Sequence, residues 1–419
     1  MPVQMKDWKQ QLVSLVVFLF PVLTASVEDA GSIIFVILML LGLRFGWQGW
    51  PQPDRDEQYV FIGLLAVLTV IALGLFYTPD LQEGIAKFER YLRIFLFIPV
   101  YLMLRRFDWQ LGRIFLLGAM VALPVLAVQG WYQTEMLGKT IATGAYHKIV
   151  FGDVAILLTA LIAVAVLTLA RERKHYLFAV LLIALGCYVA ILSVTRAAWL
   201  FVPLFLAGIL LLYSKRISAK AWMMIGVSII AVTLLITLIQ PERLTKGFKA
   251  GVANLNTYMK DPSRGGSWGA RLNMWRNSLI MFSEDPLSGK GTGSFQTENQ
   301  RLIENDISYS KYIGQYGHAH SIYFHTLAEN GLLGLVVMVT GLFILPFAYF
   351  YRRWKKAATP EQRFYTLGGM TCLLAFAWFG VSEMWLARNP FVNVYFMCML
   401  VFMSGTASLF ARQVSGQKA

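Results

Sequence analysis

Long apolar stretches separated by short polar segments run through almost the whole chain. Runs of about 17 or more mainly apolar residues are long enough to cross a lipid bilayer as helices. The pattern predicts an all-α integral membrane protein with about twelve transmembrane helices. The expected spans lie near residues 11–26, 31–47, 59–78, 88–104, 111–130, 149–170, 177–194, 197–213, 221–239, 331–351, 364–382 and 391–410.

Composition agrees with this pattern. Of the 419 residues, 57% are hydrophobic and only 14% are charged, against roughly 25% charged in ordinary globular proteins. Disorder, a nucleic-acid-binding domain and a secreted disulfide scaffold are therefore poor interpretations, and we expect no nucleic-acid partner. The cysteines Cys187, Cys372 and Cys398 lie in apolar stretches without suggestive spacing, so we expect free thiols.

The first apolar segment has an alternative interpretation. Lys6 and Lys9 precede a short apolar region that ends at Thr24, Ala25 and Ser26, an arrangement that also occurs in signal peptides. Cleavage there would leave the new end outside, so the sidedness of later loops would not change.

Basic residues predict the orientation. One alternating set of short loops, which includes both termini, holds 20 of the 37 Lys and Arg residues, and the opposite short loops hold 7. The richer set should be cytoplasmic. The remaining ten lie in one long polar segment, residues 241–320, which this topology places outside. The net charge of +14 then reports topology rather than an anionic partner.

This topology divides the chain into three parts. Residues 1–240 would form transmembrane helices 1–9, residues 241–330 a large, partly helical periplasmic loop, and residues 331–419 transmembrane helices 10–12 with a short cytoplasmic tail. A loop of that length is usually functional, so we expect the site there.

Two loop segments have alternative interpretations. Between Gly269 and Phe282 an apolar stripe of Leu272, Trp275, Leu279 and Phe282 predicts an amphipathic helix, with Arg271 and Arg276 elsewhere on its surface. It could lie on the membrane with its arginines solvated or paired to lipid phosphates. The alternating glycines of Pro286–Phe295 indicate either a turn that allows close backbone approach or a direct ligand contact.

Three histidines follow, His318, His320 and His325. A zinc site would want a further carboxylate or thiolate, and the spacing fits no standard metal motif, so we expect no metal. His320 is the preferred acid–base candidate. Ser321 can cap a helix that stops near Asn330 and Gly331, so His320 would stand where the helix dipole favours a neutral imidazole. A histidine bonded to backbone at the membrane interface is the alternative.

Other basic residues lie at the expected outer ends of spans. Arg196, in the tight turn Ser193–Trp199, either snorkels towards the surface or binds a lipid pyrophosphate. Lys87, Arg90 and Arg93 form either an interfacial helix face or a surface for a lipid-linked phosphate. Asp54 and Asp56 flank Arg55, and this acidic pair is expected to be a solvated cytoplasmic turn.

These motifs together resemble a known family. His320-Ser321, nine further residues and then Gly331-Leu-Leu-Gly334, at the end of a long outer loop, resemble the O-antigen ligase family. The segments around Arg196 and Arg271 resemble two further landmarks of that family, as does Pro286–Phe295. The turn that ends at Arg388 is similar to an outer turn in some members.

The resemblance implies a glycosyltransferase of lipopolysaccharide biosynthesis in the bacterial inner membrane, active on the periplasmic side. It would transfer a glycan from undecaprenyl pyrophosphate to a sugar hydroxyl of lipid A-core, with inversion and without metal, nucleotide or cofactor. By the same resemblance, His320 would be the base and Arg196 and Arg271 would bind pyrophosphate. Further substrate contacts are expected from Lys87, Arg90, Arg93, Arg388 and His318.

Three alternatives stay open. An O-antigen polymerase would share scaffold and donor but extend a lipid-linked glycan, and a protein O-oligosaccharyltransferase is expected to be longer. A lipid or glycan transporter would also use charges in or near spans, such as Asp153 and Glu383. The motifs favour no particular glycan, acceptor hydroxyl or oligomeric state.

Overall fold

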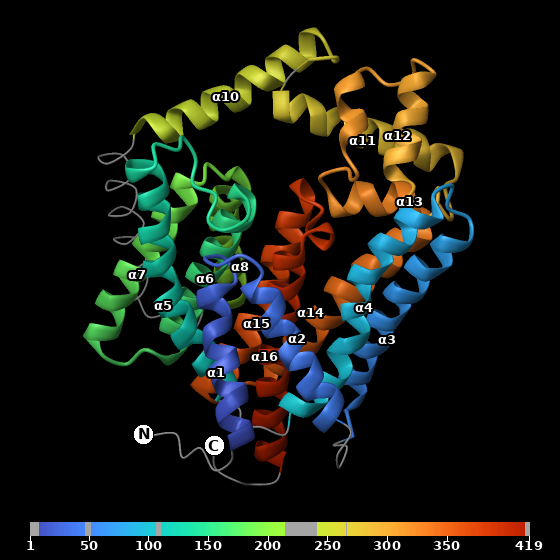
Figure 1. The fold of residues 1–419 in the computed structure, drawn as a ribbon. Helices are drawn as coiled ribbons and strands as arrows, with labels where there is room; N and C mark the ends of the chain where they lie inside the picture. Colours follow the sequence, from blue (N-terminus) through green and yellow to red (C-terminus); the bar gives the residue numbers. More distant parts are fainter. Residues whose placement is uncertain (1–7, 47–51, 106–109, 214–240, 265, 415–419) are drawn as a thin grey trace.

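The computed structural model describes residues 8–46, 52–105, 110–213, 241–264 and 266–414. Across these ranges all the regular secondary structure is helical (Figure 1). The all-α prediction is therefore confirmed. The expected ninth span, 221–239, lies outside the described residues.

The helices keep to the order that the apolar pattern predicts, with short 3₁₀ or π turns (η) at some of their ends. They are α1 (Trp8–Leu23), α2 (Ala30–Phe45), α3 (Arg55–Leu73), η1 (Gly74–Phe76), α4 (Leu81–Leu104), α5 (Leu111–Trp131), η2 (Tyr132–Met136), α6 (Lys148–Leu169), α7 (Arg173–Leu192), α8 (Arg196–Tyr213), α10 (Pro241–Lys260), α11 (Gly266–Glu284), α12 (Phe295–Glu304), η4 (Lys311–Gln315), α13 (Ile322–Val339), η5 (Thr340–Ile344), α14 (Leu345–Lys356), α15 (Pro360–Ser382), η6 (Trp385–Ala387) and α16 (Asn389–Val414).

Seven helical stretches in the described part of the chain are long and apolar enough to cross a membrane. They comprise α3, α5, α6, α7, the joined α13–α14, α15 and α16, and shorter apolar helices are α1, α2 and most of α8. The fourth expected span corresponds to α4, whose first half carries Lys87, Arg90 and Arg93. The full count of twelve stays a prediction.

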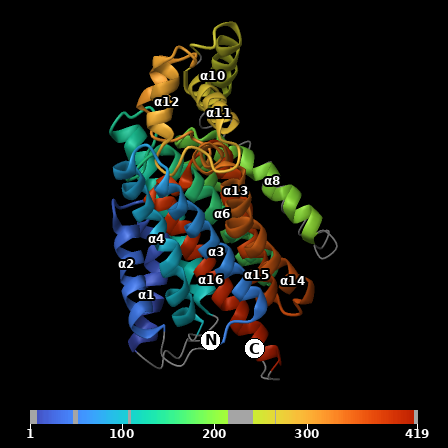
Figure 2. The ribbon, with the colours of Figure 1, turned by 90° about the vertical axis from the view of Figure 1, so that its right-hand side faces the viewer.

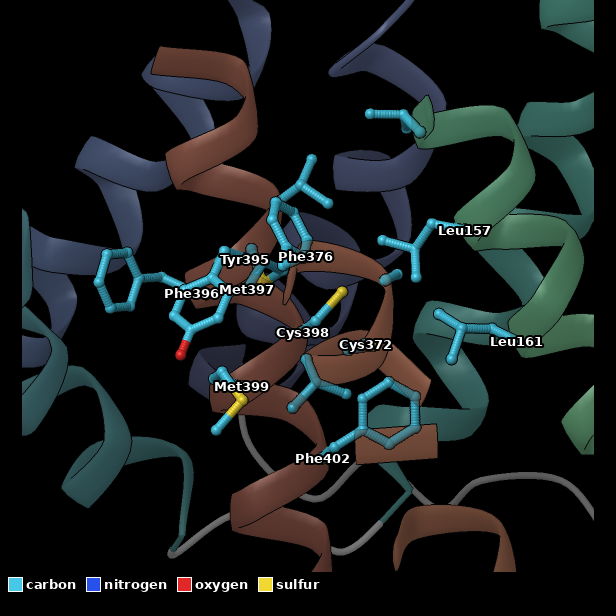
Figure 3. Close-up of a cluster of buried hydrophobic side chains, with 14 of the residues drawn as sticks. Leu157, Leu161, Cys372, Phe376, Tyr395, Phe396, Met397, Cys398, Met399 and Phe402 are labelled. Atoms are coloured by element: carbon cyan, nitrogen blue, oxygen red, sulfur yellow. The ribbon is translucent and has the colours of Figure 1, made fainter. Parts of the chain in front are cut away.

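The core of the bundle is formed by α6, α15 and α16. Of their apolar stretches 89%, 78% and 83% are buried within the protein, against 39% for α3 and for α7. Leu157 and Leu161 of α6 lie there with Cys372 and Phe376 of α15 and with side chains of α16 (Figure 3). All three cysteines are free, as expected, although Cys187 is only partly buried.

One end of the bundle is covered by residues 241–264 and 266–321. The helices α10, α11 and α12 stand above that end, whereas α1 begins and α16 ends at the opposite one (Figures 1 and 2). Packing of α11 on α13, α12 and α10 ties the segment together. Within residues 241–330 lie α10, α11, α12 and the first part of α13, whereas the bounds and the periplasmic placement of this loop stay predictions.

The face that α11 buries within the protein differs from the expected apolar stripe. Its buried face is formed by Met274, Asn277, Ser278 and Met281, whereas Leu279 is 48% exposed. The buried face packs on α13 and α12, and polar contacts hold it there. Asn277 Nδ2 donates to Asn299 Oδ1 of α12 at 2.6 Å.

The interpretation of Asp54 and Asp56 as a merely solvated turn is wrong. Asp54 caps α3 in a reciprocal arrangement with Glu57. Both aspartates form ion pairs with Arg353 at the end of α14, and Asp56 pairs with Arg352 as well. Because α3 begins where α14 ends, this acidic pair links two helices at the end of the bundle remote from α10–α12.

Candidate active site

The glycine-rich segment Pro286–Phe295 wraps against the outer ends of α3 and α4. Gly289, Gly291 and Gly293 all have positive φ angles, a conformation that glycine adopts without steric cost. A Cβ on Gly291 would lie 2.5 Å from Thr78 Cα, and one on Gly293 2.5 Å from Gly84 Cα. The predicted turn with close backbone approach is therefore confirmed.

A buried ionic cluster anchors this glycine-rich segment. Glu329 accepts hydrogen bonds from the backbone N–H groups of Gly293 and Phe295, at 3.0 and 3.1 Å. His325 Nε2 and Lys87 Nζ lie 3.4 and 3.5 Å from the same carboxylate. Lys87 also donates to the Gly317 carbonyl at 3.0 Å. Lys87 and His325 thus hold the loop to the bundle.

His320 lies directly before α13, as predicted, in an unusual backbone conformation. Its φ is 47°, in the left-handed region that non-glycine residues seldom occupy. Ser321 stands at the N-cap position but does not cap the helix, because its hydroxyl donates to the Gly380 carbonyl at 3.2 Å. The predicted stop is a kink at Gly331, with φ 63° and ψ −162°, beyond which the helix continues.

Glu383, just after α15, is the acidic partner of His320. His320 Nδ1 lies 3.4 Å from Glu383 Oε2, and Arg388 Nε lies 3.2 Å from Oε1. The Glu383 side chain is only 1% exposed. Burial alone would raise the pKa of Glu383, but His320 and Arg388 hold it well below its usual range. The carboxylate is therefore ionised and positioned behind the imidazole.

His318 lies against the other side of this group. Its Nδ1 accepts a hydrogen bond from the His320 backbone N–H at 3.3 Å, and the two imidazole rings are 4.4 Å apart. Burial, followed by the influence of His320, lowers the pKa of His318 to about 3, so this ring stays neutral. His318, His320 and Glu383 each offer one potential metal ligand within 4.8 Å of the others. Glu383 is the carboxylate that the histidine spacing did not reveal.

The two arginines singled out from the sequence lie near each other beside this group. Arg196 is the first residue of α8, and its guanidinium lies 5.8 Å from the centre of the Trp268 ring. Arg271 of α11 interacts electrostatically with Arg196 and with Glu383. Neither arginine forms an ion pair within the described ranges, and Arg196 Nη1 and Arg271 Nε are buried without hydrogen-bond partners. Such donors can bind an anion.

A third cation, Lys148, completes this basic cluster. Lys148 begins α6 and interacts electrostatically with both Arg196 and Arg271. Its carbonyl accepts a hydrogen bond from Thr195 Oγ1 at 2.9 Å, which fixes it against the turn before Arg196. In that turn Val194 has a φ of 52°, rare for a β-branched residue. Sequence reasoning counted Lys148 only as a loop charge.

The remaining basic candidates are bonded to protein groups. Arg90 Nη1 donates to the Ala387 carbonyl at 3.3 Å and Arg93 Nη1 to Asn393 Oδ1 at 3.2 Å. With Lys87 on Glu329 and Arg388 on Glu383, they join α4, η6 and α16 around the site. Their contacts with substrate stay predictions.

Known proteins share sequence similarity with the part of the chain that carries this site. A protein family described as O-Antigen ligase matches residues 179–339, which include Arg196, Arg271 and His320. These residues belong to the O-antigen ligase family. The resemblance predicted from the motifs is thereby confirmed. The chain is also 25% identical, over 357 residues, to a protein of Haemophilus influenzae described as "Uncharacterized protein", covering 83% of this chain and 86% of the relative.

The match of residues 179–339 to this family supports an O-antigen ligase or polymerase type of function in a multi-pass membrane protein. Lys148, Glu383 and Arg388 of the site lie outside the matched residues. Lys148 begins α6, and Glu383 and Arg388 are contributed by the segment between α15 and α16. In the sequence, the one sign of Glu383 was a charge at the end of an apolar span.

Proposed function

We propose that this chain is an O-antigen ligase. It would transfer a glycan from undecaprenyl pyrophosphate to a sugar hydroxyl of lipid A-core, at the periplasmic face of the bacterial inner membrane. The observation that carries the proposal is the pairing of His320 with buried Glu383, beside arginines that have unpaired, buried donors. This arrangement supports a general base next to an anion-binding site.

In this reaction His320 acts as the general base. Its Nδ1 faces Glu383, which leaves Nε2 to take the proton from the acceptor hydroxyl. The acceptor oxygen attacks the anomeric carbon of the donor. The Glu383 carboxylate stabilises the imidazolium that forms, and it is a positioning residue rather than a catalytic one.

The leaving group is the lipid pyrophosphate. The bond between the anomeric carbon and the pyrophosphate oxygen breaks, and its electron pair stays on that oxygen as new negative charge. Arg196 and Arg271 stabilise this charge, because fixed donors act strongly where water is excluded. A single displacement from the opposite face inverts the anomeric centre, and no nucleotide is required because the donor is already activated.

The choice between ligase and polymerase depends on the acceptor. Purified protein in detergent receives undecaprenyl-pyrophosphate glycan and lipid A-core as its only substrates. We expect glycan on the core. We expect His320→Ala to lower the rate about 10²- to 10⁴-fold, the usual contribution of a general base. His175→Ala, at the exposed start of α7, is the matched control and should retain activity.

Other products would overturn this assignment. Longer lipid-linked chains without product on the core would identify a polymerase. No product with either acceptor would favour transport. Full activity of His320→Ala would exclude His320 as the base.

The metal-independent chemistry is tested in the same assay. We propose that transfer needs no metal, because the Glu383 carboxylate is already engaged by His320 and Arg388. EDTA should leave the rate unchanged. Loss of activity in EDTA, restored by a divalent cation, would instead assign His318, His320 and Glu383 to a metal site.

A further inference from the structure

Two tyrosines extend from the His320 site to the surface of the loop. Tyr312 lies in η4 and is 65% exposed, and Tyr316 follows directly after η4. Their rings are 5.9 Å apart, and the Tyr316 ring is 5.5 Å from the His320 ring. We call Tyr312 and Tyr316 the tyrosine pair.

The surroundings of the tyrosine pair differ from those of another exposed aromatic residue in the same segment. Tyr309 is 51% exposed, but the Arg276 guanidinium lies 3.9 Å from its ring centre and Arg276 also bonds the Ile307 carbonyl. Tyr309 thus has a structural partner. Among aromatic rings in the described structure, the pair contacts only itself and His320. Tyr316 also packs against the small buried cluster that includes Met274 and Ile313, whereas Tyr312 is the more exposed member.

The position of Tyr316 relates it to both halves of the proposed reaction. It touches the ring of the proposed base, His320, and it interacts electrostatically with Arg271 of the anion site. In an in-line displacement the anomeric carbon lies between the base-bound acceptor oxygen and the pyrophosphate oxygen. A side chain near both Arg271 and His320 therefore flanks the sugar attached to the pyrophosphate.

We propose that the tyrosine pair binds the sugar residue directly attached to the donor pyrophosphate. This inference rests on the proposed function. A pyranose presents an apolar C–H face bordered by hydroxyl groups. A tyrosine offers a matching apolar ring with a polar tip, and the hydroxyls of the pair lie 3.5 Å apart at one edge.

The test is direct binding to two probes. One is a polyprenyl pyrophosphate that carries a single N-acetylhexosamine, and the other is the same polyprenyl pyrophosphate without sugar. Dissociation constants are measured by calorimetry for the purified full chain in detergent. We expect Tyr316→Ala to weaken binding of the sugar-bearing probe about 5- to 10-fold, in line with loss of one aromatic contact. Binding of the sugar-free probe should stay unchanged.

Further variants distinguish the loss of the aromatic ring from a general disturbance of the fold. Tyr316→Phe keeps the ring and should keep sugar-dependent binding. Tyr312→Ala should weaken the sugar-bearing probe in the same direction, whereas Tyr309→Ala, the matched control, should not. Equal weakening of both probes by Tyr316→Ala, or no effect from either member of the pair, would overturn the proposal.

Kinetics then distinguish donor from acceptor. If transfer takes place, Tyr316→Ala should raise the KM for the donor and leave the KM for lipid A-core unchanged. A rise confined to the acceptor would overturn the assignment to the donor sugar. If wild-type protein transfers no glycan, the proposed function fails, yet the binding comparison still decides whether the pair recognises the sugar.

Discussion

At the scale of single residues, His320 shows how strongly the surrounding structure determines the site. A histidine in the left-handed region is held there at a cost of the order of 1–3 kcal/mol. The bond from its backbone N–H to His318 and the contact of its Nδ1 with Glu383 Oε2 offset that cost. The imidazole is therefore fixed before substrate arrives.

The charge of Glu383 should matter more than its shape. Glu383→Gln keeps the size of the side chain but cannot stabilise an imidazolium, and it leaves Arg388 without its ion-pair partner. We expect kcat to fall about 10- to 100-fold with little change in the KM of the donor, since one buried charge interaction is worth about 1–3 kcal/mol. Steady-state kinetics check this. Glu89→Gln on the exposed face of α4 is the control, and equal kcat values for wild type and Glu383→Gln would contradict the positioning role.

Lys148 should act on the leaving group. A sugar-linked pyrophosphate carries about two negative charges, and departure adds a third, so a third cation beside Arg196 and Arg271 balances charge that forms only during transfer. We expect Lys148→Met to lower kcat about 10- to 100-fold and Lys148→Arg to retain most activity. The comparison is with Lys139→Met in the exposed loop after η2. A change in donor KM alone would show that Lys148 contributes ground-state binding only.

Sequence motifs identified the site residues that lie within continuous patterns, namely Arg196, Arg271 and His320. They did not identify Glu383 or Lys148 as members of the same site. Lys148 begins α6 and Glu383 follows α15, and they meet the others only after α6, α8 and α15 pack together and α11 packs on α13. The spacing of residues along the sequence does not reveal that these residues lie close together in the folded protein.

At the scale of elements, the start of α6 depends on a neutral histidine. His147 is the N-cap, and its Nδ1 accepts the Ile149 backbone N–H at 3.3 Å. Burial, and then Arg388, lower the pKa of His147 to about 4. The same histidine in the unfolded chain has a pKa of about 6.5. Between pH 6.5 and pH 4 the unfolded chain therefore binds more protons than the folded protein. Stability should therefore be complete above pH 6.5 and fall as the pH drops towards 4.

This contribution can be measured by thermal unfolding in detergent, followed by tryptophan fluorescence. At pH 5 the free energy of unfolding should be about 1–2 kcal/mol lower than at pH 7.5, because the unfolded chain binds a proton there and the folded protein mostly does not. His147→Asn keeps a capping acceptor that does not titrate. It should flatten the dependence between pH 7 and 5, whereas His175→Asn at an exposed position should not. The same slope in wild type and His147→Asn would exclude this cap as the origin.

The existence of the helices was predictable from apolar periodicity, but their buried faces were not always so. In α11 the stripe of large apolar residues is not the buried face, because Asn277 bonds Asn299 and Ser308 within the loop. In α13 the expected stop at Gly331 becomes a kink, because the glycine-rich segment bonds there: Leu332 N–H donates to the Pro286 carbonyl at 2.9 Å. Long-range polar contacts decide both cases.

At the scale of the whole molecule, the two ends of the bundle differ in chemistry. The end beneath α10–α12 gathers His320, Glu383 and the unpaired cations. The opposite end holds Asp54 and Asp56, paired with Arg352 and Arg353. Arg352 and Arg353 are thus paired with carboxylates at one end, whereas Arg196 and Arg271 keep donors available for an anion at the other. The long segment predicted to be outside lies on the side with the available charge (Figure 2).

This asymmetry makes sidedness decisive for the proposed function, because donor and acceptor would meet outside the inner membrane. In a chain with Cys187, Cys372 and Cys398 replaced by alanine, single cysteines are introduced at exposed Glu304, the last residue of α12, and at exposed Arg173, which starts α7 at the other end. Intact spheroplasts are treated with a membrane-impermeant maleimide. We expect label at position 304, and label at position 173 only after permeabilisation, as the distribution of Lys and Arg predicts. The opposite result would place His320, Arg196 and Arg271 on the cytoplasmic side, and the ligase assignment would then fail whatever the geometry of the site.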